Sequence, residues 1–295
     1  MDYRDKVFLE VAENLSFSKA ANELFISQPA VTKHIKELES NLNSTLFERK
    51  GNKVYLTKAG KTTYGYLKKI AQQYEELEFE LGRMNDTFKG TLRIGASSTI
   101  AQYLIPKVIA AFHKRYPKIE LFLFNGNSFE MEQKLLENEI EVALVENNSS
   151  QLNIRYTDFL DDEIVAVTGS NSAYAKLKFI SLADFQQIPI VLREKGSGTL
   201  EVIQKQLIKN NVRFDDLNIL IHLGSTEAIK NFLSDFDGIA LLSEKSIEKE
   251  LLLKQVTKIS IKGVNFHRKF RIAFRQGNES LSSKLFTEFL SRYNL

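Results

Sequence analysis

Side chains that hydrogen-bond to nucleic acids gather on one side of a short stretch near the N-terminus. Apolar residues there follow the i, i+4, i+7 and i+11 spacing of a buried helix face: Val31, Ile35, Leu38 and Leu42. The opposite face and its edges offer amide, hydroxyl and ammonium groups, and the candidate DNA contacts are Ser27, Gln28, Pro29, Ala30, Thr32, Lys33 and Lys36. A helix of this kind suits the major groove of DNA. The alternative is an ordinary solvated helix face.

A basic block surrounds this helix. Residues 15–70 hold ten Lys or Arg against four acidic residues, a net charge of +6 in a chain whose total is +3. Such a block is the footprint expected for phosphate binding. It includes residues 46–56, which are predicted to form a short hairpin, or wing, with a basic tip. Arg49, Lys50 and Lys53 are therefore candidates for contacts with the DNA backbone or minor groove, although a plain surface hairpin is the alternative.

A long helix is predicted from Thr57 to about Phe88. Its apolar residues alternate spacings of three and four without a break: Leu67, Ile70, Tyr74, Leu77, Leu81, Met84 and Phe88. One helix cannot bury such a seam by itself, so we expect it to pair with a second chain. The alternative is packing against its own domain, which usually needs a wider stripe.

Residues 1–89 resemble the DNA-binding domain and linker helix of the LysR-type transcriptional regulators. The resemblance rests on the run from Ala20-Ala21 through SQPAV to Lys33, and on a second run from Phe47 to Gly60. Thr32 and Lys33 stand where the family often carries Ser and Arg. Both keep the hydroxyl and the charge, but Lys cannot bind a guanine edge bidentately. The resemblance implies double-stranded promoter DNA, a second copy of the chain in a homodimer or homotetramer, and RNA polymerase as partners.

The remainder of the chain alternates predicted strands and helices, which indicates a parallel sheet with crossovers. Strands are expected near residues 91–96, 119–124, 141–145, 188–192, 219–223, 238–242 and 270–274. The family resemblance extends here and implies a two-lobed effector domain similar to periplasmic binding proteins.

The predicted fold class is therefore α/β with an all-α, winged N-terminal part, divided into three regions. Residues 1–58 form a winged helix-turn-helix domain, and residues 59–89 form a linker and dimerisation helix. Residues 90–295 form the effector domain, in which lobe I spans 90–161 plus 268–295 and lobe II spans 162–267.

Loops of small hydroxyl residues follow predicted strands in both lobes and precede helices. Backbone N–H groups, hydroxyls and the helix dipole make such loops receptive to carboxylate, sulfate or phosphate. The alternative is a helix cap whose hydroxyl serves only the cap. Because ligands in α/β folds bind beyond the carboxyl ends of strands, a small anionic metabolite is predicted between the lobes. Its candidate contacts are Ser97, Ser98, Thr99, Gly126, Asn127, Gly196, Ser197, Gly198, Thr199, Ser225 and Thr226.

The sequence gives little support to an enzyme. The chain has no cysteine, which rules out disulfides and thiolate metal sites and fits the cytoplasm. Its four histidines show no metal-binding spacing, and phosphate-binding or nucleophile motifs are missing. A non-enzyme without a cofactor is therefore predicted, and the pair Asp161-Asp162 is interpreted as a solvated turn at the hinge.

No run of 18 apolar residues occurs, so the sequence predicts no membrane span. Two alternatives to an effector-responsive regulator stay open: a DNA-binding protein whose α/β domain serves only oligomerisation, and a fused enzyme of the same fold. The run from Arg193 to Thr199 also resembles LysR-type members tied to sulfur assimilation.

Overall fold

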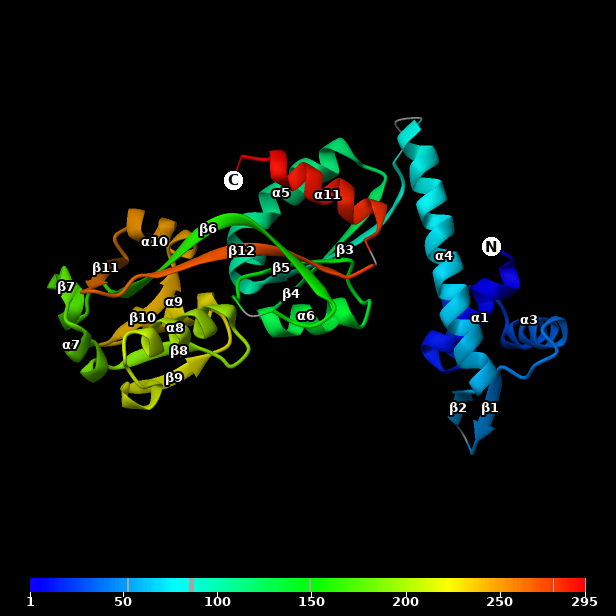
Figure 1. The fold of residues 1–295 in the computed structure, drawn as a ribbon, viewed down its shortest axis with the longest axis horizontal. Coiled ribbons are helices and arrows are strands. Elements are labelled where there is room, and N and C mark those ends of the chain that lie inside the picture. Colours follow the sequence, from blue (N-terminus) through cyan, green and yellow to red (C-terminus); the bar gives the residue numbers. More distant parts are fainter. Residues whose placement is uncertain (52, 85–87, 149, 278, 295) are drawn as a thin grey trace. The chain divides into compact units, whose positions relative to one another are not determined.

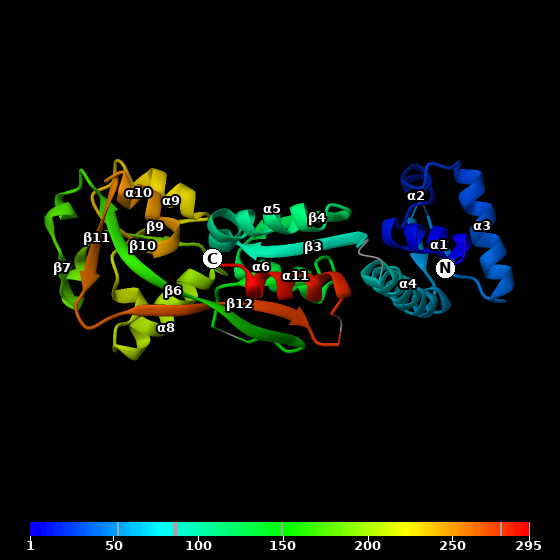
Figure 2. The same ribbon diagram turned by 90° about the horizontal axis from the view of Figure 1, so that it is seen from above.

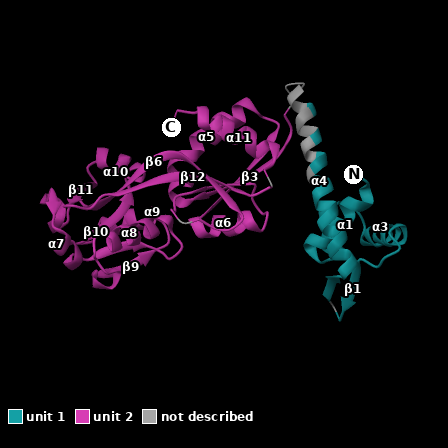
Figure 3. Cartoon of the chain, in the orientation of Figure 1, with its two compact units in different colours: residues 1–87 teal, residues 88–295 magenta. Residues whose placement is uncertain are grey.

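The computed structural model describes residues 1–51, 53–84, 88–148, 150–277 and 279–294, apart from the side chains of residues 72, 75, 76, 78–80 and 82–84. The chain divides into two compact units, residues 1–87 and 88–295 (Figure 3). Each unit is described by itself below.

The first unit combines short helices, a hairpin and one long helix (Figure 1). In chain order these are α1 (Tyr3–Asn14), α2 (Phe17–Glu23), α3 (Gln28–Asn41), β1 (Phe47–Lys50), β2 (Lys53–Leu56) and α4 (Lys58–Met84). Their shared core is formed by Val7, Phe8, Val11, Ala12, Ala20, Ala21, Val31, Ile35, Leu38, Leu46 and Phe47. The hairpin is anchored to α4 at Gly60, where a Cβ atom would lie 2.0 Å from the carbonyl oxygen of Leu46.

Two apolar residues, Leu42 and Phe88, differ from the sequence prediction for the DNA-binding domain and linker helix. Leu42 was expected on the buried face of the reading helix, but α3 ends at Asn41 and Leu42 is 47% exposed at its C-cap. Phe88 was expected to continue the seam of α4. Phe88 instead belongs to the second unit, where its ring packs against Tyr116 with 5.0 Å between the ring centroids.

The second unit is built on a ten-stranded sheet shared by two lobes. Its main path runs β4-β3-β5-β12-β6-β10-β8-β9, with β11 paired to β6 and β7 paired to β11. The strands are β3 (Gly90–Ser97), β4 (Ile119–Gly126), β5 (Val142–Val145), β6 (Ile154–Gly169), β7 (Phe179–Ile180), β8 (Ile190–Arg193), β9 (Ile219–Leu223), β10 (Ile239–Ser243), β11 (Val256–Ile261) and β12 (Phe266–Arg275).

Helices cover this sheet in both lobes (Figures 1 and 2). They are η1 (Ile100–Leu104), α5 (Ile105–Arg115), α6 (Ser128–Leu136), η2 (Ala173–Lys176), α7 (Leu182–Gln187), α8 (Gly198–Lys209), η3 (Phe214–Asp216), α9 (Thr226–Leu233), η4 (Glu244–Ser246), α10 (Glu248–Leu252) and α11 (Leu281–Arg292). We call β3, β4, β5, α5, α6 and α11 lobe I, and β7 to β11 with α7 to α10 lobe II.

The central strands explain why the sheet forms. Every residue of β5, β8 and β10 is buried, as expected for strands that are covered on both faces. Strands β3 and β4 pair in parallel from Gly90 and Ile119 onward, so their carboxyl ends lie side by side at the same end of the sheet. Parallel strands β8, β9 and β10 do the same in lobe II, so the loops after all of these strands face the boundary between the lobes.

The lobes are joined by two long strands, β6 and β12, which pair antiparallel over most of their length (Figure 1). The sequence does not predict β6, because its charged residues interrupt the alternation of apolar and polar residues that marks a strand. Asp161 and Asp162 therefore lie inside a continuous strand, and their interpretation as a solvated turn is wrong. Asp162 is buried and ion-paired with Arg268, because the register of the two strands places these residues opposite each other.

Candidate functional site

The N-terminal end of α3 is ordered by its own side chains. The Ser27 hydroxyl accepts a hydrogen bond from the Ala30 amide at 3.3 Å, and so caps the helix. Gln28 donates to the Thr32 hydroxyl at 3.0 Å, which in turn donates to the Gln28 carbonyl oxygen at 3.1 Å. Pairing holds these two polar side chains together on one face. They could reach base edges as a preorganised pair.

Positive charge lies along the same helix and on the hairpin. Lys33 and Lys36 are exposed, and Lys33 lies 4.0 Å from Glu37, too far for a strong ion pair. On the hairpin Arg49 and Lys53 are exposed, while Lys50 lies 3.1 Å from Glu48. Lys36, Arg49 and Lys53 are exposed and form no ion pair with a described residue, so their charged groups are available to phosphates.

The turn between α2 and α3 presents an aromatic residue that the sequence analysis does not single out. Phe25 is 95% exposed, and its φ of 53° lies in the left-handed region that residues other than glycine adopt less often. Its neighbours Leu24 and Ile26 pack on the core. An exposed aromatic ring next to the start of α3 could make apolar contact with a thymine methyl group.

The seam of α4 divides into a packed part and an exposed part. Leu67 packs against the core of the first unit. Ile70, Tyr74, Leu77 and Leu81 are 39–53% exposed. The side chain of Met84 lies outside the described residues. An apolar row of this kind, 39–53% exposed among the described residues, is a surface suited to pairing with another helix.

In the second unit, the boundary between the lobes is occupied by Arg193, which is 1% exposed at the end of β8. Its guanidinium donates to Ser98 of lobe I at 3.3 Å and to Thr226 of lobe II at 3.2 Å. Glu194 accepts two further bonds from it, at 2.8 and 3.0 Å. In the sequence, Arg193 stands out only as part of a motif. An arginine that ends an otherwise apolar buried strand is the signal that could have marked it.

Most of the predicted effector contacts already serve the protein itself. Asn127 and Ser225 cap α6 and α9 by accepting from Glu130 and Ala228. Three more are bonded within the protein: Ser98 also donates to the Gly126 carbonyl oxygen, Thr226 accepts from Arg193, and Thr199 donates to Glu146 and accepts from Arg268.

Two hydroxyls differ from this pattern. Ser97 is 0% exposed at the end of β3, and Ser197 is 2% exposed at the N-cap of α8. Neither hydroxyl oxygen has a hydrogen-bond partner in the described part of the chain. Ser197 makes no side-chain cap for its helix. A buried polar group without a partner is destabilising, so each is suited to receive an outside ligand.

The two glycines of the lobe II loop bring the lobes together. The Phe129 amide of lobe I donates to the Gly196 carbonyl oxygen at 3.3 Å. A Cβ atom on Gly198 would lie 2.6 Å from both the Asn147 amide nitrogen and Glu146 Cγ. Gly198 therefore permits a close approach that no other residue would allow.

A second buried arginine, Arg268, lies on the crossing strand β12. It forms a 2.6 Å ion pair with Asp162 and lies 3.1 Å from Glu146. Ser243 and Thr199 complete the group by bonding Asp162 and Arg268. Burial raises the pKa of Asp162, and the positive charge of Arg268 opposes that rise. This network ties lobe I, the crossing strands and lobe II together.

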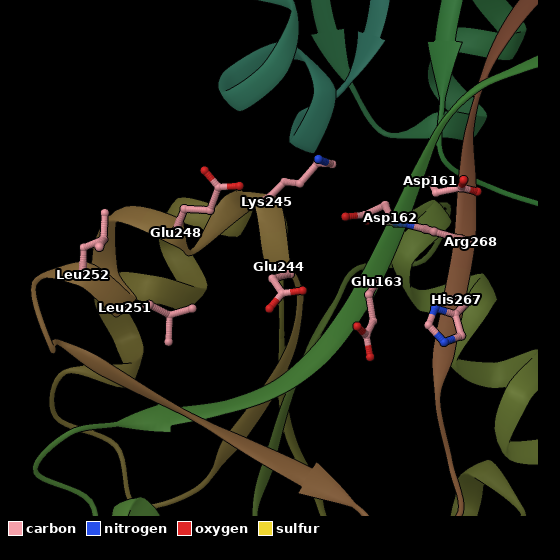
Figure 4. Close-up of a pocket in the computed structure, with 10 residues that line it drawn as sticks. All are labelled: Asp161, Asp162, Glu163, Glu244, Lys245, Glu248, Leu251, Leu252, His267 and Arg268. Atoms are coloured by element: carbon pink, nitrogen blue, oxygen red, sulfur yellow. Dashed lines mark hydrogen bonds and ion pairs between the residues drawn. The ribbon is translucent and has the colours of Figure 1, made fainter. Parts of the chain in front are cut away.

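Next to this network, a cavity of about 890 Å³ lies between the crossing strands and α10 (Figure 4). Acidic residues dominate its lining, with Lys245, His267 and Arg268 as the basic ones and two leucines at one end. It is distinct from the loops that carry Ser97 and Ser197.

The described residues contain no group of three or more His, Asp or Glu side chains arranged to hold a metal ion. Within the same residues, no helix is long and apolar enough to cross a membrane.

Comparisons with known proteins agree on one family. Residues 6–61 match the model of bacterial regulatory helix-turn-helix proteins of the lysR family, and residues 85–294 match the LysR substrate binding domain. A protein of Thalassiosira pseudonana named "Probable RuBisCO transcriptional regulator" is 34% identical over 272 residues, covering 90% of this chain and 89% of its own.

Two solved structures share the fold. The CcmR regulatory domain of Synechocystis PCC6803, in complex with 2-PG, is 26% identical with a TM-score of 0.63, covering 69% of this chain and 96% of its own. Full-length CbnR complexed with its target DNA is 18% identical with a TM-score of 0.62, covering 99% of both chains. The predicted fold class, a winged helix-turn-helix followed by a two-lobed α/β domain, is confirmed.

Proposed function

The chain belongs to the LysR family of transcriptional regulators and carries their DNA-binding and effector-binding domains, and we propose that a small anionic metabolite bound between its lobes controls its binding to promoter DNA. The observation that carries this proposal is a pair of buried hydroxyls, on Ser97 and Ser197, one from each lobe, which have no hydrogen-bond partner among the described residues. An anion accepts hydrogen bonds from such groups, and charge-assisted bonds are about twice as strong as neutral ones.

Arg193 adds to this argument. Its guanidinium bridges the lobes through Ser98 and Thr226, and so supplies positive charge at the boundary. An entering anion would compete with Glu194 for that charge. Because a ligand shifts only an equilibrium whose states it binds unequally, contacts to both lobes would favour the closed arrangement.

For DNA, we propose residues 1–58 as the binding domain. Gln28 and Thr32 would read base edges, and the remaining candidates would contact phosphates or sugars: Ser27, Pro29, Ala30, Lys33, Lys36, Arg49, Lys50 and Lys53. The paired side chains of Gln28 and Thr32 support this assignment, since they share one face at the start of α3. The exposed basic residues of the hairpin support the backbone role.

We propose that the linker of residues 59–89 joins two copies into a dimer or tetramer through α4, and that residues 90–295 form the regulatory domain. The exposed row on α4 supports the first proposal. The chain then acts in the cytoplasm, contacts RNA polymerase at promoters and has no catalytic activity of its own. The relatives that match it are transcriptional regulators.

Thermal unfolding with sulfate and with simple carboxylates tests the effector site, because a ligand of the folded state raises the melting temperature. Ser97→Ala and Ser197→Ala should abolish the rise without destabilising the free protein, since each removes a hydroxyl that has no partner in the part of the chain the structure describes. Ser225→Ala is the matched control, because its hydroxyl caps α9. It should lower the melting temperature and keep the anion response. A response that survives both serine substitutions would place the site elsewhere.

The same experiment separates the alternatives. If the α/β domain served only oligomerisation, sulfate and the carboxylates would not raise the melting temperature of the unsubstituted protein or of any serine variant. A fused enzyme would turn over candidate ligands, which product analysis after incubation would detect.

A further inference from the structure

A separate cavity of about 650 Å³ lies between α6 of lobe I and α8 of lobe II. Phe129 lines it from lobe I, and Phe214 and Leu200 line it from lobe II. Phe129 is 51% exposed, so about half of its side chain is available to a ligand in the cavity. The cavity therefore offers apolar walls from both lobes to a ligand with an apolar body.

One end of this cavity is polar. Ser197 lines it, and its hydroxyl is buried and without a partner among the described residues. Ser197 stands at the N-terminus of α8, a 12-residue helix whose dipole favours a negative charge there. Lys195 also lines the cavity, is exposed, and forms no ion pair in the part of the chain that the structure describes.

Three carboxylates line the same cavity, but each is engaged by the protein. Glu132 accepts from Asn147 at 2.8 Å and from Tyr156 at 2.7 Å. Glu194 is held by Arg193, and Glu201 by Lys205 at 2.6 Å. Glu194 and Glu201 are thus ion-paired, and Glu132 is 1% exposed with its carboxylate held by two neutral donors. Lys195 is therefore the exposed cation that the cavity offers to a ligand.

His222 adds a directional group. Its Nδ1 lies 2.8 Å from the carbonyl oxygen of Arg193. A carbonyl oxygen can only accept, so Nδ1 carries the hydrogen, and Nε2 of the neutral ring is an acceptor. A ligand hydroxyl could donate to that nitrogen. The cavity thus combines an anion-binding end, apolar walls and one acceptor.

We propose that this cavity holds the ring of an aromatic or cyclic carboxylate. The ring lies among Phe129, Phe214 and Leu200, and the carboxylate is bound by Ser197 and Lys195. This proposal rests on the proposed effector site and narrows its ligand class, because an inorganic anion alone leaves the apolar walls uncovered. Since the walls come from both lobes, the ring contributes to closing them.

The absence of cysteine from the chain allows a direct test. The Gln204→Cys variant places one thiol on the cavity lining, and Gln206→Cys places one on the same helix at similar burial, where it does not line the cavity. Two thiol reagents are compared: 5,5′-dithiobis(2-nitrobenzoate), an aromatic carboxylate, and the uncharged 4,4′-dithiodipyridine. The ratio of their rates cancels the intrinsic reactivity of each thiol.

We expect this ratio to be at least about tenfold higher for Gln204→Cys than for Gln206→Cys, with saturation at high reagent, because binding precedes reaction. Adding Lys195→Gln, or Phe129→Ala, to Gln204→Cys should reduce the ratio to that of Gln206→Cys. Lys195 is exposed, so its substitution leaves folding intact.

The proposal is overturned if the two cysteine variants show equal rate ratios. It is also overturned if the rate ratio of Gln204→Cys is high and stays unchanged when Lys195→Gln is added. The sulfate response of the unsubstituted protein is read separately by thermal unfolding. If that response is present while the ratios are equal, the anion site stands and only the ring cavity is wrong.

Discussion

Arg268 and Asp162 face each other across the paired strands β6 and β12, and their side chains form a 2.6 Å ion pair that solvent does not reach. Glu146 of lobe I adds a second carboxylate 3.1 Å from the same guanidinium. Buried charges are tolerated only when they are paired, so the position of Arg268 fixes both strands and the end of β5 relative to one another.

This arrangement predicts unequal effects of removing each partner. Arg268→Met leaves two buried carboxylates without a cation, and should lower the free energy of unfolding by about 3–5 kcal/mol. Asp162→Asn leaves the pair between Arg268 and Glu146, and should have a clearly smaller effect. Urea titration of both variants measures the difference. Equal losses would mean that Arg268 and Glu146 contribute no stabilising pair.

Glu132 predicts a dependence of stability on pH. Burial raises the pKa of this carboxyl group, although Asn147 and Tyr156 donate to it. The unfolded chain therefore releases this proton at lower pH than the folded chain, and the contribution of Glu132 to stability falls as pH rises above 4.5 towards its folded pKa. Glu132→Gln keeps an acceptor and removes the charge.

We expect Glu132→Gln to be more stable than the unsubstituted protein at pH 7, with the difference shrinking towards pH 4.5. Denaturant titrations at several pH values measure it. A difference that is constant with pH would show that Glu132 keeps the same pKa on unfolding.

The DNA contacts predict two kinds of defect. Gln28→Ala or Thr32→Ala should weaken binding at the specific site by about 1–3 kcal/mol and relax the preference for that sequence. Lys53→Ala should weaken binding to all sequences and reduce the slope of log affinity against log salt by about 1. Titrations on specific and scrambled duplexes at two salt concentrations distinguish the two. If every substitution lowered the affinities for the specific and the scrambled duplex equally, α3 would not be the helix that recognises the base sequence.

The row on α4 predicts the effect of charge at the dimer contact. Leu77 is 53% exposed and Leu81 is 50% exposed within one chain, so aspartate at both positions should leave the monomer folded. In a paired helix the same substitutions bury two unpaired carboxylates. Light scattering should then report monomers, and operator affinity should fall.

Leu252→Asp on α10 is the matched control, because Leu252 is 84% exposed and lies outside the row. It should change neither mass nor affinity. A Leu77→Asp/Leu81→Asp protein that remained dimeric would place the interface outside α4.

The sequence predicts local features of this fold well, because they depend on local rules. The buried strands β5, β8 and β10 follow from the hydrophobic pattern, whereas Asn127 and Ser225, predicted as effector contacts, serve as the helix caps that were the alternative. The family signature adds the order of the domains. What the sequence cannot supply is the register of distant segments. Arg268 and Asp162 are 106 positions apart, and only the pairing of β6 with β12 brings them together.

The candidate effector site is partly predictable for the same reason. Residue type identifies every loop of small hydroxyl residues, and the hydroxyls of Ser197 and Ser225 look alike in sequence. Their difference depends on tertiary contacts: Ser225 accepts from the Ala228 amide, whereas Ser197 makes no cap and has no partner among the described residues. The role of Arg193 could not be predicted, because its hydrogen bonds to Ser98 and Thr226 form only when the two lobes are folded against each other.

The close contact at Gly198 leads to a prediction about the separation of the two lobes. An alanine here would place its Cβ atom 2.6 Å from the Asn147 amide nitrogen, a backbone atom that cannot move aside alone. Gly198→Ala should therefore force lobe II away from lobe I. Overpacking of this kind destabilises by about 1–3 kcal/mol, and here the loss falls on the closed arrangement.

Hydrogen exchange reports this separation, because the Phe129 amide donates across the lobes to the Gly196 carbonyl oxygen. Exchange at Phe129 should accelerate in Gly198→Ala, and the anion-dependent rise in melting temperature should shrink. Gly224→Ala is the matched control, since its Cβ atom would meet nothing within 4 Å. It should leave exchange at Phe129 unchanged and stabilise slightly, by restricting the unfolded chain. Unchanged exchange in Gly198→Ala would mean that the lobes absorb the extra atom without opening, and that closure does not depend on this glycine.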